Sequence, residues 1–189
     1  MNKIAVLDIE TTGFFKNAGL ILEVGIVELD LDTGKTKIIY NELVREEAFG
    51  QKHEDSWVFK NSDLTYKGMS DAQPLDIKKI QKIFDKYYVT AFNKAFDFEF
   101  LRDRGLKIEK ELPCPMLVST NIIKLPGMYG SYKWPKVQEA WDYFFGKSNG
   151  YIEEHRGADD AVHEAKIVYE LYKMGKFEVP LGNPEVKEV

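Results

Sequence analysis

Two acids, Asp8 and Glu10, end the apolar segment IAVLDIE near the N-terminus. Side chains two residues apart on a strand point to the same face, so these carboxylates would repel each other unless a positive charge neutralises them. A metal ion does this well, because carboxylate oxygens are the ligands that Mg²⁺ and Mn²⁺ prefer. For this pair taken alone, two solvated acids at a strand end are an equal alternative.

Three further residues have side chains suited to the same chemistry. Asp97 lies among phenylalanines in AFNKAFDFEFL, where its carboxylate would be partly desolvated and would need a partner. Asp160 follows His155 in EHRGADDAVHEA, at the start of a predicted helix. Acids that complement a helix dipole are the alternative for both aspartates, and a lone histidine is more often structural than catalytic. The combination, with each residue at the end of an element, favours a metal-dependent site.

The segments LDIETTG, FNKAFDFEFL and HRGADDA together resemble the three exonuclease motifs of the DEDD family in its histidine variant. That family includes the proofreading subunits of replicative DNA polymerases and several RNA-trimming exonucleases. The resemblance extends over about residues 3–173, and LILEVGIV places Glu23 and Gly25 as in the family's second strand. The sequence departs from the family's usual pattern at two places that could affect substrate binding. It has Lys67-Gly68 where His-Gly is common in the family, and Gly157-Ala158 where Ala-Leu is common.

The resemblance implies an RNase H-like fold and 3′-to-5′ removal of nucleotides with two divalent ions, Mg²⁺ or Mn²⁺. It implies that Asp8 bridges both ions and that Glu10 and Asp160 complete one site. It also implies that Asp97 holds the second ion, partly through water, and that His155 is the general base. An imidazole takes a proton from water near neutral pH, so activity is expected to rise as His155 loses its proton.

The substrate-binding candidates lie beside these motifs and are Thr11, Thr12, Phe14, Asn93 and Phe96. Phe14 and Phe15 follow the first motif, and we expect one ring to stack on a terminal base and the other to pack. Backbone N–H groups at the two threonines would hold the terminal 3′ hydroxyl or phosphate. For Asn93, bracing its own loop is an equal alternative, and for Phe96 core packing is the stronger one.

Basic and aromatic residues outside the motifs offer further contacts. Candidate phosphate contacts are Lys94, Lys133, Lys136 and Arg156, although each is individually more typical of a solvated charge. Tyr129, Tyr132 and Trp134 lie in LPGMYGSYKWP, and aromatics beside lysines suit single-stranded nucleic acid. A loop pinned by its own aromatic rings is an equal alternative. No role is assigned to His53 or His163.

The elements that would position these residues form an α/β fold, a mixed five-stranded sheet flanked by helices. The apolar patterns predict strands at 3–9, 20–31, 36–44, 88–92 and 113–118. They predict helices at 74–87, 95–105, 120–124, 133–145 and 157–174. Residues 45–70 have no single period and are expected to form a long loop with short helical turns.

Length and composition fit one domain. The 189 residues are expected to divide into an exonuclease domain at 1–176 and a flexible tail at 177–189. The formal charge is −5, which gives no global attraction to nucleic acid, so bound metal ions or local basic patches would have to supply it. A single cysteine, Cys114, and the lack of a long apolar stretch favour a cytoplasmic protein without membrane contact. The oligomeric state is left open, with a monomer favoured.

The leading hypothesis is a metal-dependent 3′–5′ exonuclease that acts on single-stranded 3′ ends, with DNA as the expected substrate and nucleoside monophosphates as products. One alternative is an RNA-end-trimming exoribonuclease of the same family. Another is a non-catalytic module that binds nucleic acid or a polymerase, although the chain retains all four acids and the histidine. A proofreading partner of a DNA polymerase is a further alternative, and the short tail slightly favours a stand-alone enzyme.

Overall fold

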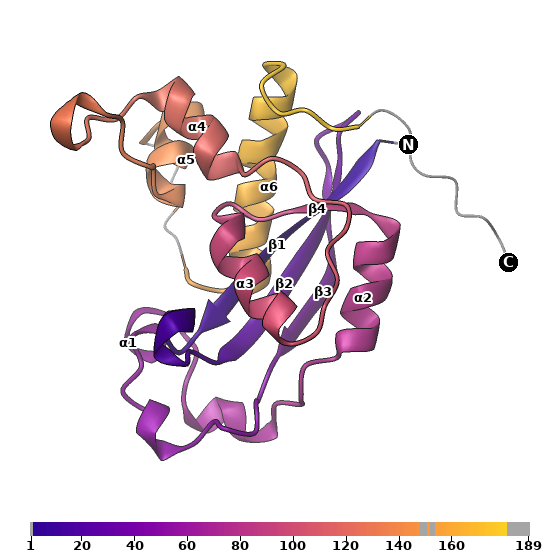
Figure 1. Cartoon of the computed structure of the whole chain (residues 1–189), viewed down its shortest axis with the longest axis vertical. Coiled ribbons are helices and arrows are strands. Elements are labelled where there is room, and N and C mark those ends of the chain that lie inside the picture. The colour runs from indigo at the N-terminus through magenta and orange to yellow at the C-terminus, as the bar shows by residue number, and fades with distance from the viewer. Residues whose placement is uncertain (1, 148–150, 152–153, 181–189) are drawn as a thin grey trace, which may run out of the picture.

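The computed structural model of the chain describes residues 2–147, 151 and 154–180. Its sheet has the strand order β3-β2-β1-β4 (Figure 1). The strands are β1 (Lys3–Thr11), β2 (Ile21–Asp30), β3 (Thr36–Leu43) and β4 (Tyr88–Thr90). β1 is antiparallel to β2 and parallel to β4, and β3 is antiparallel to β2, so the sheet is mixed as predicted.

The predicted fifth strand at 113–118 is wrong, because most of this segment lies in helix α4 (Pro115–Ile123). Pro115 occupies the first helical turn, where the missing N–H of proline costs nothing and its fixed φ angle favours the helix. The short apolar run before Ser119 is equally compatible with a buried strand and a buried helix, which is why periodicity alone misassigned it. The described sheet therefore has four strands.

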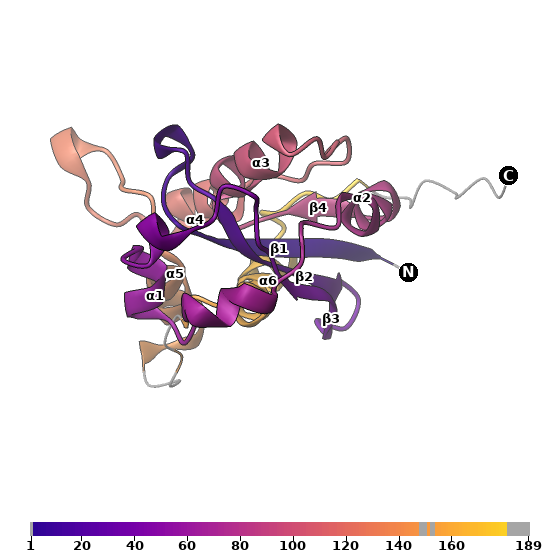
Figure 2. The ribbon, with the colours of Figure 1, turned by 90° about the horizontal axis from the view of Figure 1, so that it is seen from below.

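The helices cover both faces of the sheet. Besides α4 they are α1 (Trp57–Asn61), α2 (Ile77–Lys86), α3 (Lys94–Asp103), α5 (Val137–Phe145) and α6 (Gly157–Lys173). Figure 2 shows α2 and α3 on one side of the sheet and α5 and α6 on the other. The predicted helices at 74–87, 95–105, 133–145 and 157–174 are confirmed within a few residues, and 120–124 is the end of α4. The predicted loop at 45–70 contains α1 and two single turns, at 51–53 and 67–71.

The side chains of β1 alternate between two hydrophobic clusters. Ile4 and Val6 pack with residues of α5 and α6, whereas Leu7 and Ile9 pack with residues of α2 and α3. Because a strand has a period of two residues, the side chains of Asp8 and Glu10 continue the face that α6 covers. A third cluster packs α1 and its neighbouring turns beside the start of β2.

After α6, the ring of Phe177 is buried in the same cluster as Ile4 and Val6. Residues 181–189 of the predicted tail lie outside the described residues. Among the described residues, no helix is both long and apolar enough to span a bilayer.

Candidate active site

The first two acids lie at the carboxyl end of β1. Asp8 pairs with Gly25 across the antiparallel ladder, and Glu10 pairs with Glu23, just before a register shift at Thr11. Cross-strand partners share a face, so both acids and Glu23 point to the side that α6 covers. The first turns of α3 and α6 come to this same end of the strand, which brings the three predicted motifs together.

Glycines let α6 approach the sheet at this point. A Cβ atom at Gly25 would lie 2.1 Å from the carbonyl carbon of Gly157, the first residue of α6. A Cβ at Gly157 would in turn lie 2.8 Å from the backbone nitrogen of Gly25. No side chain fits between these two backbones, so the helix start is held directly against the strand pair that carries Asp8.

The start of α6 carries the third motif. Asp160 is only 3% exposed, and its carboxylate accepts hydrogen bonds from the Arg156 N–H at 3.0 Å and from the Tyr151 hydroxyl at 3.1 Å. His155 precedes the helix with a left-handed φ of 55°, a conformation that costs free energy in a residue other than glycine. Potential metal-ligating atoms of Glu10, His155 and Asp160 all lie within 4.8 Å of one another.

Asp97 joins the site from the first turn of α3. It is 3% exposed, and its Oδ1 atom accepts a hydrogen bond from the Ile9 N–H at 3.2 Å, which ties α3 to β1 between the two acids. Burial raises the pKa of Asp97 to about 7, although hydrogen bonds from its own N–H and from that of Ile9 lower it. Such a carboxyl ionises readily only when a positive charge lies near it.

A fifth acid, Glu164, is also buried at this site and was missed by the sequence analysis. It is 3% exposed and accepts a hydrogen bond from the Phe92 N–H at 3.2 Å. Burial raises the pKa of Asp8 well above its usual range, and the next largest cause is repulsion by Glu164, ahead of the other site acids. Glu164 lies four residues after Asp160, on the same face of the helix, and this spacing was the available signal.

An ion pair between Arg156 and Glu23 attaches the start of α6 to β2. Arg156 donates two hydrogen bonds of 2.9 Å to the carboxylate of Glu23, which is 1% exposed and also accepts the Gly157 N–H at 3.1 Å. The Arg156 guanidinium also donates a hydrogen bond to the carboxylate of Asp63 at 2.7 Å. The guanidinium predicted as a phosphate contact is therefore engaged in joining α6 to β2 and to the loop after α1.

A cavity of about 500 Å³ opens beside Glu10. Its lining residues are Ile9, Glu10, Thr11, Thr12, Gly13, Phe14, Trp57 and Phe96. The rings of Phe14 and Phe96 meet edge to face at 6.3 Å, and Phe14 is 63% exposed. Trp57, which the sequence analysis missed, lies edge-on to His155 with ring centres 4.6 Å apart. Its segment has no periodic pattern, so no sequence signal placed it here.

The other predicted contacts have different surroundings. Phe15 packs against Phe100 at 5.4 Å, so of the two adjacent phenylalanines it is the packing one. The Thr12 N–H donates to the Leu20 carbonyl, and its hydroxyl accepts from the Leu20 N–H, which braces the loop. The Thr11 hydroxyl donates to the Gly13 carbonyl at 2.9 Å.

The two predicted polar contacts at the start of α3, Asn93 and Lys94, have different surroundings. Asn93 is exposed at the start of α3, and its side chain makes no capping hydrogen bond there. Lys94 donates to the Leu112 carbonyl at 2.6 Å and pairs with Glu111 at 3.2 Å. The lysine is thus held at the edge of β4, whereas the asparagine amide faces solvent.

Solved structures resemble this chain, whereas no protein-family model and no curated protein sequence matches it. A full-length 3′-exonuclease is 18% identical with a TM-score of 0.65, over 92% of this chain and 61% of the other. The nuclease domain of 3′hExo, a DEDDh family member bound to rAMP, is 17% identical with a TM-score of 0.63, over 94% and 96% of the two chains. E. coli exonuclease I in complex with a dA16 oligonucleotide is 11% identical with a TM-score of 0.65, over 92% and 41%. The chain spans about three fifths of the full-length 3′-exonuclease and has the fold of these exonucleases.

Proposed function

We propose that this chain is a DEDD-family exonuclease of the histidine variant that removes nucleoside monophosphates from the 3′ ends of single-stranded nucleic acid. The observation that carries the proposal is the convergence of Glu10, His155 and Asp160 within 4.8 Å, at the strand end where Asp97 is also buried and Asp8 is half-buried. Crowded carboxylates, of which Asp8 and Asp97 have raised pKa values, are the expected state of an oxygen-ligand site for divalent cations.

The donor set fits two Mg²⁺ or Mn²⁺ ions. Asp8, Glu10, Asp97 and Asp160 would hold them, and four carboxylates at −4 balance two ions at +4. Such a pair stabilises both the attacking and the leaving oxygen of a phosphodiester displacement. His155 would accept the proton of the attacking water at its imidazole nitrogen as the water oxygen bonds to phosphorus and the bond to the leaving 3′ oxygen breaks. The leaving oxygen then gains a proton from the protonated ring or from solvent.

The cavity beside Glu10 would receive the terminal nucleotide. Phe14 and Phe96 supply ring faces and edges for its base, and Trp57 closes the cavity next to His155. Stacking on aromatic rings is worth about 1–3 kcal/mol per base and tolerates every base, which suits an enzyme that shortens strands of any sequence. The exposed amide of Asn93 is a candidate hydrogen-bond partner for the substrate.

The test of this function is digestion of matched 5′-labelled DNA and RNA strands with Mg²⁺ and then Mn²⁺, with EDTA as the metal-free arm. We expect progressive shortening from the 3′ end, and the two strands decide between DNA and RNA. Asp8→Asn should abolish shortening while the circular dichroism spectrum stays unchanged. A metal-loaded wild type that leaves both strands intact would refute the proposal.

His155 can be separated from the metal-holding acids by its own variant. We expect His155→Ala to lower turnover by about 10²–10⁴-fold, the usual worth of a positioned proton transfer, and to lose the acidic limb of the pH–rate profile. Mn²⁺ binding, measured by calorimetry, should persist. An unchanged acidic limb with metal still bound would assign the proton transfer to another group, and lost Mn²⁺ binding would make His155 a ligand instead.

A further inference from the structure

A loop between α4 and α5, residues 124–136, projects from the protein and is called the aromatic loop below. In Figures 1 and 2 it extends on the same side of the molecule as α1 and the carboxyl end of β1. Its large apolar side chains are unusually open to solvent: Tyr129 is fully exposed, Met128 is 77% exposed and Trp134 is 65% exposed. Exposed apolar groups gathered on one projection are typical of a binding surface.

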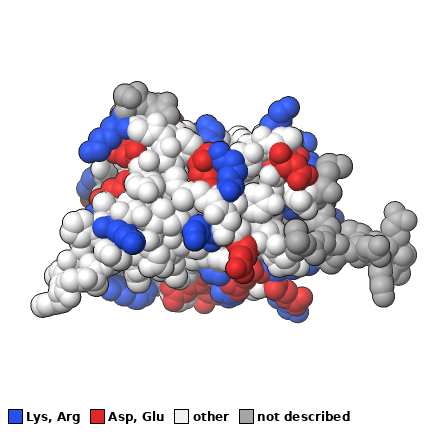
Figure 3. Space-filling view, turned by 90° about the horizontal axis from the view of Figure 1, so that it is seen from above, with Lys and Arg blue, Asp and Glu red and all other residues white. Residues whose placement is uncertain are grey.

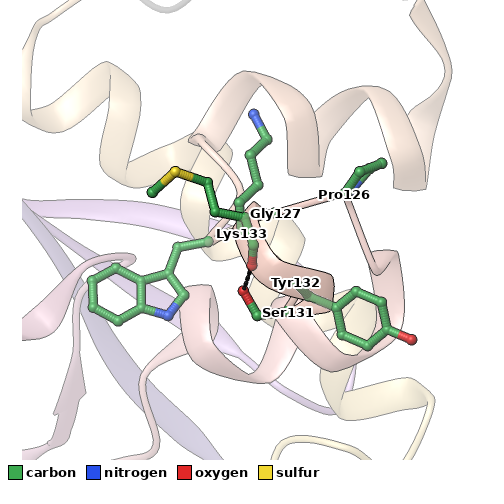
Figure 4. A pocket seen from close by; sticks show the side chains of 7 residues that line it. Pro126, Gly127, Ser131, Tyr132 and Lys133 are labelled. Carbon is green, nitrogen blue, oxygen red and sulfur yellow. Dashed lines mark hydrogen bonds between the residues drawn. The ribbon is translucent and has the colours of Figure 1, made fainter.

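Backbone hydrogen bonds build this loop, so it does not merely trail between two helices. Pro126 and Tyr132 form an antiparallel bridge, and the Gly127 N–H donates to the Ser131 carbonyl at 2.9 Å. The Ser131 hydroxyl donates to the Met128 carbonyl at 2.7 Å, drawn as the dashed line in Figure 4. The loop is thus shaped by hydrogen bonds within itself, and its exposed aromatic rings do not pack in a hydrophobic core.

Two of these residues have backbone conformations that favour such a tip. Tyr129 has a φ of 55° and Gly130 a φ of 78°, both left-handed. A tyrosine in this conformation costs free energy, since only glycine adopts it freely. A fully exposed aromatic ring on a strained residue gains nothing from the fold that surrounds it, which points to a role in binding.

The charge of the loop selects its ligand. Residues 124–136 contain Lys124, Lys133 and Lys136 and no acid, in a protein whose formal charge is −5. Lys133 pairs with Glu139 on α5 at 2.5 Å, and Lys124 lies 5.9 Å from the centre of the Tyr132 ring. Figure 3, which looks onto this end of the molecule, shows a white projection at the lower left, and both basic and acidic side chains lie on the surface that adjoins it.

A cavity of about 600 Å³ lies within the loop. Its lining residues are Pro126, Gly127, Met128, Ser131, Tyr132, Lys133 and Trp134. Figure 4 shows the side chains of Tyr132 and Lys133 leaving the loop in different directions. Because Glu139 pairs with the Lys133 ammonium, the other two lysines of the loop, Lys124 and Lys136, are the candidate cationic contacts. Flat rings for bases beside ammonium groups for phosphates match a single strand of nucleic acid.

We propose that the aromatic loop binds the single-stranded segment on the 5′ side of the nucleotide being removed, with bases on Tyr129 and Trp134 and phosphates at Lys124 and Lys136. This inference rests on the proposed function for the position of the strand's 3′ end. The loop increases the affinity for long strands and takes no part in hydrolysis. It gives an acidic protein a local attraction to a polyanion.

The test compares the wild type with a Tyr129→Ser/Trp134→Ser double variant. The matched control is Tyr143→Ser, which removes another exposed aromatic ring, 52% exposed on α5 outside the loop. Binding of a fluorescent 20-nucleotide single strand and of a trinucleotide is measured by anisotropy in EDTA, where no hydrolysis interferes. We expect the double variant to bind the long strand about 10-fold more weakly and the trinucleotide unchanged, and the control to match the wild type.

The kinetic arm uses the same proteins with Mn²⁺. The double variant should lose about 10-fold in kcat/KM on the 20-nucleotide strand, through KM, and nothing on the trinucleotide. Equal binding of the long strand by variant and wild type would overturn the role of the loop. An equal loss with the control, or a loss on the trinucleotide, would overturn it as well. A wild type that binds strands through the loop but hydrolyses none would instead refute the proposed function, and of this inference only the binding of single strands by the loop would stand.

Discussion

At the scale of single residues, the site is defined by side chains that repel one another in the metal-free protein. The pKa of Asp8 is raised by burial and then by Glu164, Glu10, Asp97 and Asp160, in that order. Five carboxylates in one place destabilise the fold unless cations or protons neutralise them. This arrangement costs stability, and under the proposed function bound cations would offset that cost.

Glu164 offers the sharpest test at this scale. Glu164→Gln keeps an oxygen that can accept the Phe92 N–H but removes a negative charge beside Asp8, so we expect Mn²⁺ to bind about 10-fold more weakly. Calorimetric titration of the metal checks this. The matched control is Glu170→Gln, which removes the same charge from α6 at a residue paired with Lys173. Mn²⁺ affinity that falls equally in both variants, or in neither, would contradict a local role for Glu164.

At the scale of elements, the position of α6 depends on backbone contact with the sheet. Asp97 joins α3 to β1 through the Ile9 N–H, and Glu23 joins β2 to α6 through Arg156 and the Gly157 N–H. These contacts cross between elements distant in the sequence. The acids therefore keep their mutual positions only while the two helices stay seated on the strand pair.

We expect Gly25→Ala to destabilise the protein by about 1–3 kcal/mol and to lower activity, because its Cβ would lie 2.1 Å from Gly157 and would push α6 off the sheet. Urea unfolding measures the first effect and strand digestion the second. Gly50→Ala is the control, since a Cβ there meets no atom within 4 Å and the φ of −167° is ordinary extended backbone. Equal unfolding midpoints for the two variants would show that α6 does not need this contact.

At the scale of the whole molecule, the acids link stability to pH. The pKa of Asp97 is raised from an ordinary 3.8 to about 7 in the folded protein, so between these values the folded state binds more protons than the unfolded one. Stability from this group is therefore lost as pH rises from about 4 to 7, and the loss is on the order of a few kcal/mol. Divalent cations that bind only the folded state should restore it.

The measurement is the unfolding free energy in EDTA at pH 5 and pH 8, for the wild type and for Asp97→Asn. The amide retains an oxygen for the Ile9 N–H and cannot ionise, so the variant should lose less stability than the wild type between the two pH values. The difference between the proteins reports Asp97 together with its repulsion of Asp8, and cancels groups whose pKa is lowered by surface partners, such as Glu28 and Glu139. Parallel pH profiles would show that Asp97 is not destabilised by ionisation.

Local features were predictable from the residues alone: the strand that carries Asp8 and Glu10, the two strands after it, and the helix that begins near Asp160. These follow from side-chain periodicity and turn residues within short windows, where local backbone preferences decide the structure. The motif residues were named from their types and spacing. The strand predicted at 113–118 was wrong because a short buried apolar run is compatible with a helix and a strand equally. In the folded protein most of this segment is helical.

The packing of the helices on the sheet set which distant residues meet. It brought Trp57 from a segment without periodicity to the ring of His155, placed Glu164 beside Asp8, and turned Arg156 from a free cation into a partner of Glu23. Such contacts depend on how helices seat on a sheet, which burial and backbone approach set over the whole chain and which no short window encodes. The acids could thus be named from the sequence. The closeness of their carboxylates, and the repulsion between them, arise from the packing of α3 and α6 on β1.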